Sequence, residues 1–308
     1  MTVVLRAEKL SKWYGNILGI SDINLEIKPG IIGLLGPNGA GKSTFLKIAA
    51  GQLKPKIGSL QIFGENVFAN HLLFRRIGFC PEHDSAYMEM SGWQFVMLLA
   101  RLHGFAPAEA AAKSEKALAT VGLLESKDRA IKGYSFGMRQ RLRLASSILH
   151  EPELLMLDEP LRGIDPVWRI QIIQLIKDYE KQGRTVIVSS HILPEIEAMT
   201  NEIVLIHQGK IFAKGDIQRI RGLIDSHPHQ VSILCPDPRL LASKLINNEH
   251  VLSMEFTAHG HGLTVKTGQR DQFFSALMRL IVEDKMVVDE ITSPDDNLQA
   301  VFDYLIGK

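Results

Sequence analysis

The most informative stretch of this chain is Gly36-Pro37-Asn38-Gly39-Ala40-Gly41-Lys42-Ser43-Thr44, which fits the pattern G-x-x-x-x-G-K-[ST]. An apolar run typical of a buried strand, Ile31 to Leu35, precedes it, and a helical pattern, Lys42 to Ala50, follows. Glycines let backbone N–H groups surround phosphates, and the helix directs its positive end at the same charge. The alternative is a glycine-rich turn before a helix. We therefore predict that all nine residues bind a nucleoside triphosphate, with Lys42 at the β- and γ-phosphates and Ser43 on Mg²⁺.

A second informative stretch, Leu154 to Pro160, is an apolar strand that ends in the acids Asp158 and Glu159. Ligands of open α/β sheets lie at the carboxyl ends of strands. We expect Asp158 to hold Mg²⁺, directly or through water, and Glu159 to act as general base on the attacking water. The alternative is that the two acids cap a helix or face solvent.

Strand and helix patterns alternate from Val3 to about Gly222, which predicts an α/β fold with a largely parallel sheet and helices on both faces. The expected strands are Ile31–Leu35, Ile77–Cys80, Leu154–Leu157, Thr185–Ser189 and Ile203–His207. The expected helices are Lys42–Ala50, Phe136–Leu149 and Pro166–Lys181.

The pattern changes after a polar segment, Asp225 to Gln230. We expect a domain over 1–222, a linker over 223–230 and a C-terminal accessory domain over 231–308. The order in this last part reads β-α-β-β-α-β, the ferredoxin-like α+β arrangement, with its last strand at Val287–Ile291. A further helix is expected from Ser293, with an apolar stripe of Leu298, Val301, Phe302 and Leu305.

Composition gives no sign of a nucleic-acid or membrane-spanning protein. The formal net charge is +1, without a basic excess, and the two cysteines, Cys80 and Cys235, lie far apart. The first residues lack the apolar core of a signal peptide, and the longest apolar stretch, near Phe95 to Ala100, is far shorter than the ~20 residues that span a bilayer. We expect a soluble, cytoplasmic protein that reaches a membrane only through a partner.

Together, the glycine-rich loop and the acidic strand resemble the nucleotide-binding domain of an ABC transporter, and the resemblance covers residues 3 to 220. Tyr14 resembles the aromatic residue that stacks on adenine, as a flat apolar ring can. Trp13 is an alternative residue for that role. The alternative without a function in binding is that the aromatic residue simply belongs to the buried core.

The resemblance includes the family's signature loop, usually LSGGQ, at Tyr134-Ser135-Phe136-Gly137-Met138. Ser135 and Gly137 match, whereas Phe136 and Met138 depart from it. Ser135 is also a good helix N-cap. In the family this serine binds the γ-phosphate of ATP held by the other subunit.

Two further positions follow the family's order. Asp165, in Ile164-Asp165-Pro166, resembles the loop at the dimer interface, and it can also cap the next helix. His191 resembles the histidine that contacts the γ-phosphate. The resemblance thus implies catalytic roles for Lys42, Glu159 and His191.

Glu82 departs from the family, which usually has glutamine after the strand that corresponds to Ile77–Cys80. A glutamate is acceptor-only when ionised and could ligate Mg²⁺. Glu82 and the sequence YSFGMRQR resemble ATPases of exporters more than those of importers.

The resemblance implies an ATPase that uses ATP and Mg²⁺, assembles head to tail with a second ATPase subunit, as a homodimer or a heterodimer, and powers an integral membrane permease. It places the protein peripherally on the cytoplasmic face. A helical subdomain is implied over about 84–150, and no nucleic-acid partner is expected. The alternative function is a soluble, non-transport ABC ATPase that acts on ribosomes or nucleic-acid assemblies.

Overall fold

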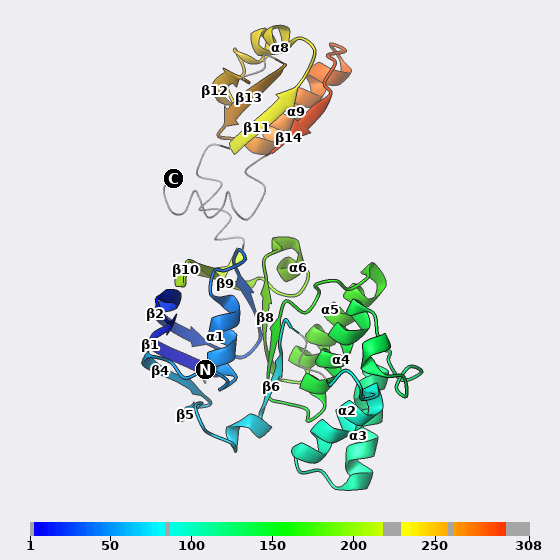
Figure 1. Cartoon of the computed structure of the whole chain (residues 1–308). Helices are drawn as coiled ribbons and strands as arrows, with labels where there is room; N and C mark the ends of the chain where they lie inside the picture. The colour runs from blue at the N-terminus through cyan, green and yellow to red at the C-terminus, as the bar shows by residue number, and fades with distance from the viewer. Residues whose placement is uncertain (1–2, 84–86, 218–228, 258–260, 294–308) are drawn as a thin grey trace. The chain divides into compact units, whose positions relative to one another are not determined.

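The computed structural model describes residues 3–83, 87–217, 229–257 and 261–293 (Figure 1). The chain divides into two compact units, Met1–Asp216 and Ile217–Lys308. Within the described ranges, no helix is both long enough and apolar enough to cross a membrane.

The first unit is built on a six-stranded sheet of order β10-β9-β3-β8-β7-β6. Its strands are parallel except β10, which runs antiparallel to β9. Their bounds are β3 Ile31–Leu35, β6 Ile77–Cys80, β7 Leu154–Asp158, β8 Thr185–Ser190, β9 Glu202–His207 and β10 Lys210–Asp216. The five expected strands are confirmed to within one residue at each end. β3, β7 and β8 are fully buried, as befits a parallel sheet covered on both faces.

A second, antiparallel sheet of order β2-β1-β4-β5 was not predicted. Its strands are β1 Leu5–Tyr14, β2 Ile17–Ile27, β4 Ile57–Ile62 and β5 Glu65–Asn66. Figure 1 shows helix α1 (Lys42–Ala49) between the two sheets. Phe45, Leu46 and Ile48 of α1 are buried in a core that includes Leu5 of β1 and Met156 of β7. The antiparallel sheet therefore covers one face of the helix that follows the glycine-rich loop.

Helices α4, α5 and α6 pack on the other face of the central sheet, and α2, α3 and α4 lie within the range expected to be helical, about 84–150 (Figure 1). Their bounds are α2 Gly92–Leu102, α3 Pro107–Thr120, α4 Phe136–Ile148, α5 Pro166–Lys181 and α6 Leu193–Glu197, with short 3-10 turns at Leu73–Arg75 and Ile131–Gly133. Ser91 begins α2 with a reciprocal capping box to Gln94. The expected helices at α1, α4 and α5 are confirmed, and α5 has the predicted bounds.

The second unit has the expected β-α-β-β-α-β order. Its elements are β11 His229–Leu234, α8 Pro238–Leu245, β12 Val251–Phe256, β13 Gly262–Thr267, α9 Arg270–Val282 and β14 Glu290–Thr292. The sheet order is β12-β13-β11-β14, with all neighbours antiparallel. Phe273 and Leu277 of α9 pack on Val231 and Val265 of the sheet.

Two boundaries in this unit were predicted wrongly. β11 begins at His229, inside the expected linker, because His229 and Gln230 pair with Thr267 and Lys266 of β13. The last strand is Glu290–Thr292 rather than 287–291, since only these residues pair with β11. The helix expected from Ser293 lies outside the described residues.

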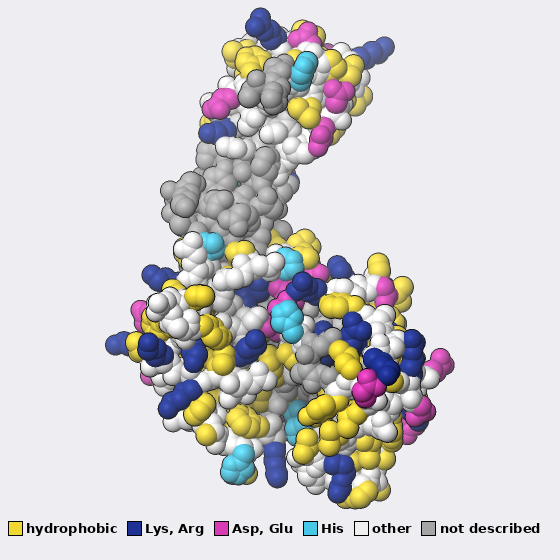
Figure 2. All heavy atoms as spheres, in the orientation of Figure 1, with side chains coloured by type: hydrophobic (Ala, Val, Ile, Leu, Met, Phe, Trp, Pro, Cys, Tyr) yellow, Lys and Arg dark blue, Asp and Glu magenta, His cyan; other side chains and the backbone are white. Residues whose placement is uncertain are grey.

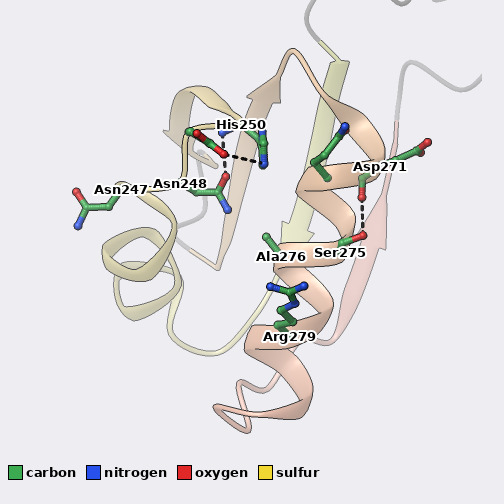
Figure 3. A pocket seen from close by; sticks show the side chains of 9 residues that line it. Asn247, Asn248, His250, Asp271, Ser275, Ala276 and Arg279 are labelled. Carbon is green, nitrogen blue, oxygen red and sulfur yellow. Dashed lines mark hydrogen bonds and ion pairs between the residues drawn. The ribbon is translucent and has the colours of Figure 1, made fainter.

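The second unit also has a shallow hollow of about 650 Å³ between the end of α8 and helix α9 (Figure 3). Exposed side chains of both signs line it, among them Asp271 and Arg279 on α9 and Glu249 near His250. Figure 3 shows His250 and Arg279 on opposite sides of this hollow. The Ser275 hydroxyl donates to the Asp271 carbonyl within the helix rather than into the hollow.

Candidate nucleotide-binding and hydrolysis site

The glycine-rich loop runs from the end of β3 into α1 and requires glycine for steric reasons. Gly41 has φ = 108°, in the left-handed region, and a Cβ there would lie 2.7 Å from the carbonyl oxygen of Gly19. A Cβ on Gly36 would lie 2.2 Å from the carbonyl oxygen of Ile206. A hollow of about 310 Å³ opens on this loop and is lined by Tyr14, Ile17, Leu18, Gly19, Pro37, Asn38, Gly39, Ala40, Gly41, Lys42, Ser43, Thr44, Glu82, Glu159 and Arg162.

Lys42 is buried inside this loop, with 5% of its side chain exposed. Its ammonium group donates to the carbonyl oxygens of Gly36, at 2.6 Å, and Pro37, at 3.2 Å. It also lies 3.2 Å from Oε1 of Glu159, which is 6% exposed. The loop thus holds a positive charge beside the predicted general base.

Glu159 lies between Lys42 and His191. Its Oε2 is 3.0 Å from Nδ1 of His191, which follows β8. Glu159 has φ = 50°, a strained conformation for a residue with a Cβ. The structure therefore places both Lys42 and His191 in contact with Glu159, whose backbone conformation is strained.

Asp158 ends β7 and is fully buried. Burial raises the pKa of its carboxyl group, the Ser189 and Ser43 hydroxyls lower it, and the charges of Glu82 and Glu159 raise it further. Oδ1 accepts a hydrogen bond of 2.6 Å from Ser189, whereas the buried Oδ2 has no hydrogen-bond partner. A buried carboxylate oxygen without a partner, beside a hydroxyl, fits a hard divalent cation such as Mg²⁺.

No group of three His, Cys, Asp or Glu side chains forms an all-protein metal site in the described part of the chain. A cation at Asp158 and Ser43 would therefore draw its remaining oxygen ligands from phosphates and water, as Mg²⁺ commonly does.

Glu82 follows β6 and lies in the same hollow, but its carboxylate is engaged by a neighbour. Nη1 of Arg162, in the turn after Glu159, donates to Oε1 of Glu82. Nε2 of His83 lies 3.8 Å from Oε2. The predicted metal ligand is thus held in an ion pair.

Tyr14 ends β1 and lines the hollow, and 45% of the residue is exposed. Its hydroxyl lies 3.4 Å from the Thr44 hydroxyl. Trp13, the alternative aromatic residue, instead lies under Lys56, whose ammonium group is 5.6 Å from the ring centroid. Of the two rings, Tyr14 is therefore the one among the residues that line the hollow.

Ser135, Gly137 and Asp165 are not among the described residues that line this hollow. Ser135 caps α4, accepting from the N–H of Met138 at 3.2 Å. Asp165 caps α5 by accepting from the N–H of Trp168 at 3.1 Å. Ser135 and Asp165 therefore both cap helices, which is the structural alternative expected for each of them.

Four residues of the site were not singled out by the sequence. Ser189 joins the two acids of β7, because it donates to Asp158 and accepts from the N–H of Glu159 at 2.9 Å. Gln140 of α4 donates to the carbonyls of Glu159 and Pro160. Arg143 and Arg162 both lie near Glu82. The sequence feature that could have pointed to Ser189 is a small polar residue at the end of an apolar strand. For Arg162 that feature is a cation close behind two acids.

A lysine-bearing glycine loop that faces a buried Asp-Glu pair at the carboxyl edge of a parallel sheet defines a P-loop ATPase. The family model described as ABC transporter matches residues 20–162. Over its whole length the chain is 33% identical to the bacitracin transport ATP-binding protein BcrA of Enterococcus faecalis, of which it covers 97%. The chain belongs to the family of ABC transporter ATP-binding subunits, and it is an ATPase.

The chain is also similar to a second transport-related protein and to a solved structure. The chain is 29% identical, over 91% of its length, to the daunorubicin/doxorubicin resistance ATP-binding protein DrrA of Streptomyces peucetius, and it covers 85% of that protein. A solved structure of an ATP-binding subunit of an ABC transporter matches with a TM-score of 0.65 and 28% identity, covering 72% of this chain and 93% of that one.

Proposed function

We propose that this chain is the ATP-hydrolysing motor of an exporter whose membrane-spanning permease is a separate subunit. The observation that carries the proposal is the 97% coverage of the bacitracin transport protein, which extends through the second unit. The resemblance to a drug-resistance ATPase supports the same direction of transport. Bacitracin, daunorubicin and doxorubicin stand in the names of these relatives, so a cargo of this kind, an antibiotic or a drug, is part of the proposal.

In this proposal the loop from Gly36 to Thr44 binds the phosphates of ATP, and Tyr14 stacks on the base. Ser43 and Asp158 would hold Mg²⁺, which neutralises charge that develops on the phosphates. Glu159 takes the proton of the attacking water, and His191 orients the Glu159 carboxylate across their 3.0 Å contact. Lys42 exchanges its loop carbonyls for phosphate oxygens.

A second ATPase subunit completes the site. Ser135, Gly137 and Asp165 lie outside the hollow of their own chain, although the family's signature loop and interface loop act at the nucleotide. We infer that they act on the nucleotide of the other subunit in a head-to-tail pair. Since one chain carries both sets, two identical copies would form two complete sites.

A permease partner would hold the protein on the cytoplasmic face of the membrane. Large apolar side chains are exposed near the loop after β6 and on α2, namely Tyr87, Met88 and Leu102. Figure 2 shows hydrophobic side chains gathered over the helical region of the first unit. Such a surface suits a protein partner better than nucleic acid.

We propose a domain organisation of 1–222 for the ATPase, with its helical subdomain at about 84–150, 223–230 for the linker and 231–308 for an accessory domain. The antiparallel order β12-β13-β11-β14 supports a ferredoxin-like assignment for the last of these.

Purification of tagged Glu159→Gln protein from gently solubilised membranes, in the presence of ATP, tests the function. A multi-spanning membrane protein recovered at equal stoichiometry would support the transporter. Recovery of ribosomal or chromosomal proteins, with the ATPase soluble throughout, would contradict it and favour a non-transport ABC ATPase. Lys42→Met protein, treated in the same way, is the control for ATP-dependent capture.

A further inference from the structure

Glu82 and Arg162 join two loops that leave the same edge of the central sheet. β6 and β7 are parallel neighbours, with Cys80 opposite Leu157, so the loops that follow them lie side by side. Nη1 of Arg162 donates to Oε1 of Glu82, and both side chains line the hollow over the glycine-rich loop. The ion pair is thus part of the wall of the nucleotide site.

A second arginine lies near Glu82 from another direction. Arg143 of α4 is 4% exposed, and although burial lowers the pKa of its guanidinium group, the charge of Glu82 raises it. Nη2 of Arg143 donates to Oε1 of Gln140, and Nε2 of Gln140 donates to the carbonyl oxygen of Glu159 at 3.4 Å. The N–H of Arg162 also donates to that carbonyl oxygen, at 3.2 Å. Both arginines are therefore anchored to the turn that carries Glu159.

The charges of the hollow explain why such a pair is needed. Three carboxylates, those of Glu82, Asp158 and Glu159, lie near one another, and the charges of the other two raise the pKa of Asp158. Lys42 is the cation that faces Glu159. A triphosphate brings several more negative charges, so an unpaired carboxylate at Glu82 would repel it.

We propose that Arg162 is a positioning residue for nucleotide binding, and that it acts by neutralising Glu82 and holding its carboxylate at the wall of the hollow. The incoming triphosphate then meets only the two acids at the end of β7. This inference rests on the proposed binding of ATP in the hollow, but it does not depend on a permease or a cargo.

The test is a set of calorimetric titrations of the full-length protein with ATP, first in EDTA and then with Mg²⁺. Arg162→Ala should weaken the binding of metal-free ATP by roughly tenfold, because it exposes the Glu82 charge. The double variant Glu82→Gln/Arg162→Ala should bind within about twofold of Glu82→Gln alone, because little remains for Arg162 to neutralise. Arg162→Lys, which keeps the charge, should stay close to the wild type.

Equal losses from Arg162→Ala in both backgrounds would mean that Arg162 contacts the nucleotide directly, and this would overturn the proposal, as would unchanged binding by Arg162→Ala. Lys132→Ala is the matched control, because Lys132 forms an exposed ion pair of 2.6 Å with Glu89 and does not line the hollow. A wild-type protein that binds no ATP at all would instead count against the proposed function.

Discussion

The hydroxyl of Ser189 donates a hydrogen bond of 2.6 Å to Oδ1 of Asp158. The Ser189 hydroxyl oxygen also accepts from the N–H of Glu159 at 2.9 Å, so one side chain fixes both acids at the end of β7. Asp158 is thereby left with Oδ2 free of hydrogen-bond partners. A residue that orients a metal-binding carboxylate in this way acts on the metal through that carboxylate.

Ser189→Ala should therefore raise the Mg²⁺ concentration needed for half-maximal ATP hydrolysis by about 10- to 100-fold, the usual loss of metal affinity when such a partner is removed. Titration of the ATPase rate with free Mg²⁺ measures it. Ser190→Ala is the matched control, because its hydroxyl binds Glu195 at 2.7 Å and not the acids of β7. Equal shifts in the two variants would show that the effect comes from loosening the end of the strand.

Glu159→Gln should stop turnover while leaving ATP binding intact and trapping a dimer. The amide cannot accept the proton of water, which should cost at least about 100-fold in rate. The change also removes the negative charge that holds Lys42 at 3.2 Å, so Lys42 becomes freer to meet phosphates. Phosphate release and size-exclusion chromatography with ATP measure the two effects. Hydrolysis at the wild-type rate would contradict the assignment of Glu159 as the base.

Lys42→Ala should lose nucleotide affinity by about 100-fold or more, because a buried cation that faces the phosphates has no replacement. It also leaves Glu159 buried beside an empty position, so Lys42→Met, which keeps the apolar stem, separates a binding defect from a folding defect. Calorimetry with ATP and thermal unfolding measure the two properties. Unchanged ATP binding by both variants would contradict the role of Lys42.

Much of the central sheet was readable from the sequence because buried parallel strands are short apolar runs that end in functional residues. Ile31–Leu35 and Leu154–Asp158 are of this kind. The antiparallel sheet was missed because β1 and β2 are long and mixed in character, and their pairing shifts register at several points. Such strands are defined by their partners rather than by a local pattern.

The residues of the site likewise divide into those that the sequence predicted and those that it missed. The glycine loop, Asp158, Glu159 and His191 follow motifs, and the structure brings them together. Arg143 and Arg162 belong to no motif, because their role depends on Glu82, which lies far away in the sequence and becomes a neighbour only through the pairing of β6 with β7. The sequence shows a cation close behind two acids at Arg162, but only the three-dimensional structure shows that its partner is Glu82.

His103 and His150 form a stacked pair of rings in the first unit, and this pair links the stability of the fold to pH. The ring of His150 lies 4.0 Å from that of His103, and its Nε2 is 2.9 Å from the carbonyl oxygen of Ile77. Burial, followed by the charge of His103, lowers the pKa of His150 from 6.5 to about 4, so the folded protein keeps this ring neutral. The unfolded chain takes up the proton at a higher pH. The stability that the neutral, buried His150 contributes to the free energy of unfolding is therefore fully present above about pH 6.5. It is lost as the pH falls towards about 4.

His150→Gln removes this titration but keeps a donor for the Ile77 carbonyl. We expect the variant to melt below the wild type at pH 7.5 and to approach it at pH 5, with the gap narrowing by roughly 2–4 °C for each kcal/mol of linked stability. Thermal unfolding at the two pH values measures the gap. His71→Gln, at an exposed histidine, should keep a constant difference from the wild type. A gap between wild type and His150→Gln that is equal at both pH values would show that the buried ring is not the group whose protonation destabilises the fold.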